Sequence, residues 1–111
     1  MPQICSLKDK TCKPCEGDET LKFNNKQIKE HLSQVKDWKI KNSKLYKEFK
    51  FKNFKQALDF VNQIGNISEQ EQHHPNIKIN YNKVSIELYT HAINGLSEND
   101  FILSAKINNI Q

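Results

Sequence analysis

Two runs of alternating apolar and polar residues in the last third of the chain form its clearest pattern and predict a β-hairpin. With a two-residue turn at Asn82–Lys83, Ile79 would pair with Ile86, and Ile77 would pair with Leu88. These pairs would share one apolar face of the hairpin, and polar pairs would occupy the other. The clean separation of the two faces supports this register.

Extended outward, the same register brings together two histidines that are far apart in the sequence. His74 would lie opposite His91, and directly opposed residues have Cβ atoms roughly 4.5–5.5 Å apart. Pro75 cannot donate a hydrogen bond to a neighbouring strand, so regular pairing could end before His74 is reached. The pattern therefore predicts a cleft that is lined by imidazoles at this end of the hairpin.

A helix is expected near the start of the patterned region. Asn24 or Asn25 can cap it, because a short polar side chain accepts hydrogen bonds from the first free backbone N–H groups. Ile28, Leu32 and Val35 then fall on one helical stripe.

A second hairpin and two further helices complete the pattern. Apolar and polar residues alternate over residues 38–51, on both sides of a turn at Asn42–Ser43. Asn53 can cap the long helix that follows. The segment Ser97–Asp100 fits a capping box at the start of the last helix. The predicted order is therefore α-β-β-α-β-β-α. The apolar positions of the long helix that are expected to face the sheet are Phe54, Ala57, Leu58, Val61 and Ile64 or Gly65.

Length and charge limit the protein classes that this chain can belong to. The 111 residues suffice for one domain with a modest core, and oligomerisation would help such a core. No apolar run is long enough for a membrane span or a secretory signal, so we expect a cytoplasmic protein. The formal charge of +4 comes from lysines that are spread along a chain without arginine. This dispersal favours a solvated surface over direct nucleic acid binding.

Residues 1–20 show no apolar period and are expected to form an N-terminal arm that precedes a domain at 21–111. The arm contains Cys5, Cys12 and Cys15, the last two as Cys-Lys-Pro-Cys. A redox role would call for a βαβ context, which is missing, and a zinc site usually needs a fourth ligand. We therefore interpret residues 1–20 as a loosely attached arm with reduced thiols.

The histidine cluster is the strongest candidate for chemistry. His73, His74 and His91 could supply a general acid and a general base, because imidazole gains and loses a proton near physiological pH. Such a pair suits an elimination or hydration that needs no cofactor. The same residues could instead be three nitrogen ligands of a metal ion, but adjacent histidines rarely converge on one metal, and we predict no metal.

The spacing of these residues resembles the signature of a known family. The order Glu69, His73-His74-Pro75, Tyr81, His91 and Asp100 is similar to that of the pterin-4a-carbinolamine dehydratases. The resemblance extends from about Leu21 to the C-terminus and includes the segments 49–54 and 81–84. Ile77 stands where many members have Trp, which bears on which pterin fits the pocket.

The resemblance implies an α+β fold with a four-stranded antiparallel sheet and helices on one face, assembled as a homodimer or homotetramer. It implies a lyase that removes water from 4a-hydroxytetrahydropterin to give quinonoid dihydropterin, in pterin recycling and without a cofactor. By position, the catalytic residues would be His73, His74, His91 and Asp100. The substrate-binding residues would be His74, Pro75, Glu69 and Thr90.

Two of these residues have simpler alternatives. Asp100 could complete the cap of the last helix, and Glu69 could be a solvated carboxylate or an orienter of His73. A second function is also implied, because animal members act as dimerisation cofactors of a homeodomain transcription factor. That activity would add a nuclear location to the cytoplasmic one.

Overall fold

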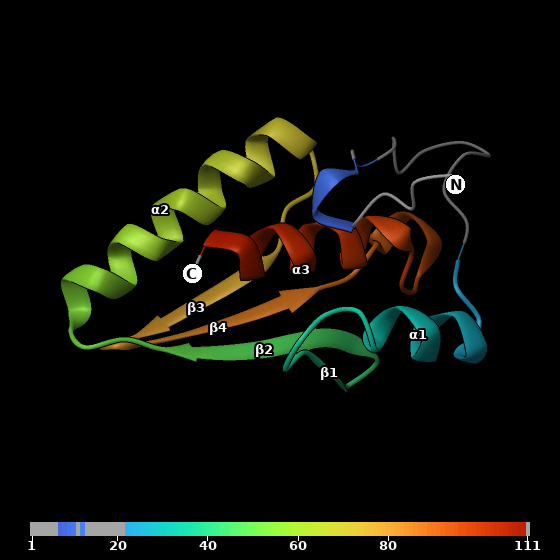
Figure 1. Cartoon of the computed structure of the whole chain (residues 1–111), viewed down its shortest axis with the longest axis horizontal. Helices are drawn as coiled ribbons and strands as arrows, with labels where there is room; N and C mark the ends of the chain where they lie inside the picture. The colour runs from blue at the N-terminus through green and yellow to red at the C-terminus, as the bar shows by residue number, and fades with distance from the viewer. Residues whose placement is uncertain (1–6, 11, 13–21, 111) are drawn as a thin grey trace, which may run out of the picture.

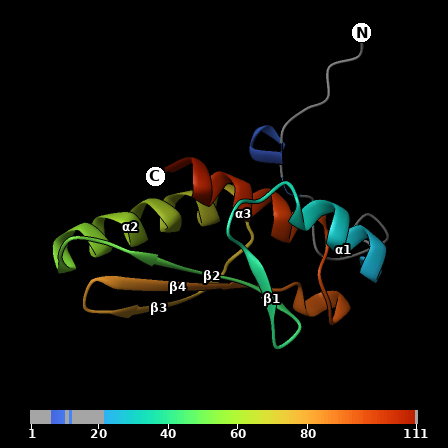
Figure 2. The same ribbon diagram turned by 60° about the horizontal axis from the view of Figure 1, so that its bottom comes forward.

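The computed structural model describes residues 7–10, 12 and 22–110, and these form a four-stranded sheet covered by helices on one face (Figures 1 and 2). The sheet order is β1-β2-β4-β3, and every neighbouring pair is antiparallel. The α+β prediction and the order of its elements are confirmed. The elements are η1 (Leu7–Asp9), α1 (Asn25–Leu32), β1 (Lys39–Lys41), β2 (Lys44–Lys50), α2 (Phe54–Glu71), β3 (Asn76–Asn80), β4 (Lys83–Leu88), η2 (His91–Ile93) and α3 (Glu98–Ile110).

Local signals place the helix starts and the first turn as expected. The Asn24 side chain accepts a hydrogen bond from the Gln27 N–H at the start of α1, and Asn53 accepts one from Gln56 at the start of α2. The β1–β2 turn lies at Asn42–Ser43, where both residues have positive φ values. That conformation matches the right-handed twist of the two strands and so favours a tight hairpin.

The core lies between β4, the neighbouring β2 and the helices. The inward residues of β4, Val84, Ile86 and Leu88, are fully buried, and so are Leu45 of β2 and Phe101 of α3. Because β4 is paired on both sides, its backbone groups are satisfied while its apolar face packs on the helices.

The predicted register of the β3–β4 hairpin was wrong by two residues. Ile77 pairs with Ile86, Ile79 pairs with Val84, and the turn lies at Tyr81–Asn82. A shift of two keeps every side chain on its predicted face, because strand side chains alternate with period two. It also removes the expected pairing of His74 with His91, since β3 begins only at Asn76 and β4 ends at Leu88.

Contacts with β2 explain the position of this turn. The Phe51 N–H donates to the Asn82 carbonyl at 2.7 Å, and the Asn82 side-chain amide donates to the Phe51 carbonyl at 2.9 Å. These bonds fix Asn82 against the end of β2, and Tyr81 accordingly adopts a left-handed conformation with φ of 54°. The turn is therefore set by a third strand and not by the hairpin sequence alone.

The face of α2 that packs on the sheet differs in part from the prediction. Ala57 and Ile64 are buried as expected, but the helix also buries Phe60, which the predicted stripe omitted. Phe54 and Leu58 remain 44% and 39% exposed, so their assignment to the core was wrong. The helix thus exposes two large apolar side chains to solvent.

Gly65 lies on the exposed side of α2, where a Cβ would meet no atom within 4 Å. We expect Gly65→Ala to raise the free energy of unfolding by about 0.5–1 kcal/mol, because alanine has less conformational freedom to lose when the helix forms. Urea denaturation of both proteins measures this. Gly95→Ala is the contrasting control. Its Cβ would lie 2.6 Å from Lys22 Cε, so the same gain in stability is not expected there. Equal stability of Gly65→Ala and the unmodified protein would contradict the expectation.

No helix in the described ranges is both long enough and apolar enough to cross a membrane.

Candidate active site

A buried hydrogen bond between His73 and Asp100 joins the end of α2 to the start of α3. Gln72 ends α2 in a left-handed conformation, and the His73 N–H still donates to the Ser68 carbonyl. The chain turn thereby aims the His73 ring at α3, where Nε2 lies 2.7 Å from Asp100 Oδ1. The side chains are only 6% and 0% exposed. A carboxylate only accepts hydrogen bonds, so Asp100 holds the His73 tautomer that carries its proton on Nε2.

The second oxygen of Asp100 is held by two further donors. The Thr90 hydroxyl donates to Oδ2 at 2.8 Å, and the Ser97 N–H donates to the same atom at 3.0 Å. The Ser97 hydroxyl lies 2.9 Å from the Thr90 hydroxyl and extends the network. Three donors around one buried carboxylate offset its loss of hydration. Asp100 therefore caps α3 and holds His73 at the same time.

His74 is held by a different carboxylate on the surface. Its Nε2 bonds to Glu69 Oε2, and both side chains are more than half exposed. Glu69 thus contacts His74, and its carboxylate remains largely exposed to solvent. Pro75 follows as a half-buried residue and leads the chain into β3.

His91 lies one residue from the Asp100 network. It opens η2 as an exposed residue, and its ring centroid is 5.0 Å from that of Tyr89. The preceding residue, Thr90, is 1% exposed and is paired through its backbone with Gly95. The base of the loop that carries His91 is therefore fixed both by this bridge and by the bond from Thr90 to Asp100.

The described part of the N-terminal arm is packed, which corrects the expectation of loose attachment. Leu7 is 5% exposed, and Lys10 forms an ion pair of 2.9 Å with Glu98 at the start of α3. The Cys12 N–H donates to Glu71 Oε1 at 2.8 Å, and its thiol lies 3.7 Å from the Asn99 carbonyl oxygen. Cys5 and Cys15 lie outside the described residues.

Burial raises the pKa of the Cys12 thiol from 9.0 to about 12, and the neighbouring Glu71 carboxylate adds to the shift. The neutral thiol therefore stabilises the fold below about pH 9, and this contribution is lost as the pH rises towards 12. At pH 8.5 we expect iodoacetamide to alkylate Cys12 at least about tenfold more slowly in the native chain than in urea. Peptide mass spectrometry measures this, and equal rates in both conditions would contradict it.

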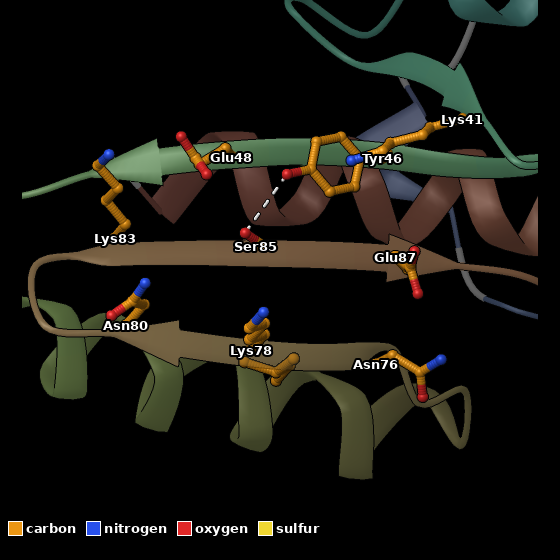
Figure 3. A pocket seen from close by; sticks show the side chains of 10 residues that line it. Lys41, Tyr46, Glu48, Asn76, Lys78, Asn80, Lys83, Ser85 and Glu87 are labelled. Carbon is orange, nitrogen blue, oxygen red and sulfur yellow. Dashed lines mark hydrogen bonds between the residues drawn. The ribbon is translucent and has the colours of Figure 1, made fainter.

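A hollow of about 370 Å³ lies on the opposite face of the sheet (Figure 3). Residues of all four strands line it, and they mix cations such as Lys78 with anions such as Glu87. Tyr46 spans its middle with a hydroxyl 3.4 Å from Ser85 Oγ. No histidine lines this hollow, so the candidate acid and base groups lie elsewhere. Within the described ranges, no group of three or more His, Cys, Asp or Glu side chains could hold a metal ion.

Sequence reasoning missed the residues that support the site. Ser97 was predicted only as part of the helix cap. No role was predicted for Glu71, although it stands two residues before His73. A carboxylate at the very end of a helix is unfavourable beside the helix dipole, which is a signal that Glu71 has another partner.

Comparisons with known proteins find a family match and similar sequences. The family model described as pterin 4 alpha carbinolamine dehydratase matches residues 21–110. A protein of Rickettsia canadensis is 48% identical over 91% of this chain and 94% of its own length, and one of Alkaliphilus metalliredigens is 44% identical over 96% of each. Both carry the provisional name pterin-4-alpha-carbinolamine dehydratase.

A solved structure shares the fold. The crystal structure of a protein described as transcriptional coactivator/pterin dehydratase from Brucella melitensis superposes with a TM-score of 0.78 at 30% identity. The match covers 81% of this chain and 98% of the other.

Proposed function

Because the chain belongs to the pterin 4 alpha carbinolamine dehydratase family, we propose that it removes water from 4a-hydroxytetrahydropterin to give quinonoid dihydropterin. The observation that supports this proposal is the hydrogen bond that holds the buried His73 imidazole against Asp100. A fixed imidazole suits acid and base chemistry near neutral pH. No cofactor enters the proposal, since the pterin is the substrate.

The reaction needs two proton transfers. The carbon–oxygen bond of the 4a-hydroxyl breaks, and the ring nitrogen bonded to C4a loses its proton as a carbon–nitrogen double bond forms. A general acid delivers a proton to the departing hydroxyl, which leaves as water, and a general base accepts the proton from nitrogen. Two imidazoles on one substrate can divide these tasks.

We assign the acid and base roles to His73 and His91, and the task of holding the 4a-hydroxyl to His74. Asp100 supports His73 by fixing its ring and tautomer. Glu69 supports His74 in the same way.

Two further residues, Pro75 and Thr90, were predicted to bind the substrate, and we propose a different role for each. Pro75 is half-buried beside His74 and is proposed to line the pterin pocket. Thr90 was also expected to contact substrate, but its buried hydroxyl donates to Asp100. We therefore propose that it anchors Asp100 instead.

A direct assay tests the function. Purified protein should accelerate the dehydration of freshly generated 4a-hydroxytetrahydropterin, followed by the absorbance of quinonoid dihydropterin. His31→Ala serves as the matched control, because this fourth histidine packs against Phe23 and Phe101 and has no proposed role in the reaction. A rate equal to the uncatalysed one would refute the proposal.

The exposed apolar residues of α2, Phe54 and Leu58, favour a helical partner. We propose that this face builds a homodimer or homotetramer. The coactivator wording attached to the Brucella melitensis protein makes hetero-assembly the alternative function.

Light scattering separates these two assemblies. Leu58→Asp should dissociate a homo-oligomer to monomers. A binding module would instead form stable complexes with a helical partner even after all three site histidines were replaced. The predicted cytoplasmic location and the absence of direct nucleic acid binding stay predictions.

A further inference from the structure

Glu71, the last residue of α2, is enclosed between two other parts of the chain. Its side chain is 11% exposed, and Oε1 accepts the backbone N–H of Cys12 at 2.8 Å. Its other oxygen lies 3.7 Å from the Lys106 ammonium group on α3. One carboxylate thus ties the end of α2 both to the N-terminal arm and to α3.

The N-terminal arm also contacts α3 directly. The Cys12 thiol lies 3.7 Å from the carbonyl oxygen of Asn99, the residue before Asp100. Lys106 also donates to the Lys8 carbonyl at 2.8 Å. In Figure 1 the end of α2, η1 and α3 lie together, and η1 packs directly on α3. The arm therefore bridges α3, which carries Asp100, and the end of α2, which lies two residues before His73.

The position of the end of α2 relative to α3 bears on the His73–Asp100 bond. Only Gln72 separates Glu71 from His73, so movement of the helix end is passed directly to the imidazole. A bond of 2.7 Å tolerates little displacement. Misplacement of a reacting group by about 1 Å can lower a rate by about a hundredfold.

We propose that Glu71 is a positioning residue for the His73–Asp100 pair, acting through the Cys12 backbone and Lys106. The proposal rests on the function proposed above and names a residue and an arm contact that the predicted site did not include. Its role is to keep the His73 ring at hydrogen-bond distance from Asp100 without touching substrate.

Three variants test this role. Glu71→Ala removes both contacts, and we expect kcat to fall about tenfold or more with little change in KM. Glu71→Gln keeps a side-chain oxygen for the Cys12 N–H and should restore most of kcat. Lys106→Met removes the ammonium group that lies near Glu71, and we expect it to lower kcat by a smaller factor. Asp59→Ala is the matched control, because this carboxylate lies exposed on the same helix.

A readout independent of activity accompanies the kinetics. Nuclear magnetic resonance follows the Nε2 proton of His73, whose downfield shift reports the bond to Asp100. Glu71→Ala should broaden or shift this resonance, and Glu71→Gln should return it. If Glu71→Ala does not fold, Glu71→Gln and Lys106→Met supply the same comparison.

The outcomes separate the two proposals. A Glu71→Ala protein with a lowered melting temperature but unchanged kcat and an unchanged His73 resonance would overturn the positioning role. If the unmodified protein shows no dehydratase activity, the proposed function fails. The His73 resonance then still decides whether Glu71 positions the pair.

Discussion

Replacing His73 with glutamine is expected to lower the rate of pterin dehydration by about 10²–10⁴-fold. Glutamine can place an amide N–H near the position of Nε2, so Asp100 keeps a hydrogen-bond donor and the buried carboxylate is not left unpaired. What the variant loses is the ability to gain and release a proton near neutral pH. The expected loss is therefore one of chemistry and not of folding.

The kinetic pattern identifies the cause. If His73 acts on the reacting groups, kcat and kcat/KM should fall together, because the missing interaction exists mainly in the transition state. Thermal unfolding of the same sample should show a melting temperature within a few degrees of the unmodified protein. A His73→Gln enzyme with an unchanged kcat would remove the acid and base roles from this residue and would leave His91 and His74 as candidates.

Replacing Asp100 with alanine is expected to lower the free energy of unfolding by about 3–5 kcal/mol. The change removes the buried acceptor that the His73 Nε2–H, the Thr90 hydroxyl and the Ser97 N–H share. It also removes the cap of α3. Each buried donor left without a partner destabilises the fold by about 1–3 kcal/mol.

Asp100→Asn separates shape from charge in this network. Asparagine fills the same space and keeps one carbonyl oxygen, so we expect a loss of only about 1–3 kcal/mol. Urea denaturation at a fixed protein concentration measures both variants, with Asp59→Ala expected within about 0.5 kcal/mol of the unmodified protein. An Asp100→Ala protein as stable as the Asp59→Ala control would show that the network contributes little to the fold.

Local interactions explain the parts of the structure that the sequence predicted well. The caps at Asn24 and Asn53 and the turn at Asn42–Ser43 each depend on residues within a few positions of one another. The alternation of the strands also assigned their side chains to the right faces. Signals of this kind are present in the chain before any tertiary contact forms.

The errors arose where distant segments decide between local alternatives. The Asn82–Lys83 turn was as compatible with the strand pattern as the observed one, and the contact of Asn82 with Phe51 selected the latter. On α2 the sequence offers two adjacent apolar stripes. Only the position of the sheet determines that Phe60 is buried and Leu58 is not.

By itself, the sequence determined the order of the elements, the faces of the strands and the set of histidines around which chemistry was expected. The tertiary structure alone decided their partners: His73 pairs with Asp100 across 27 positions, and His74 pairs with the surface carboxylate of Glu69. It also decided that the arm packs at Cys12 against Glu71. The physical reason is that short-range patterns fix the direction of a side chain, while the groups that it meets depend on how α2 and α3 pack together.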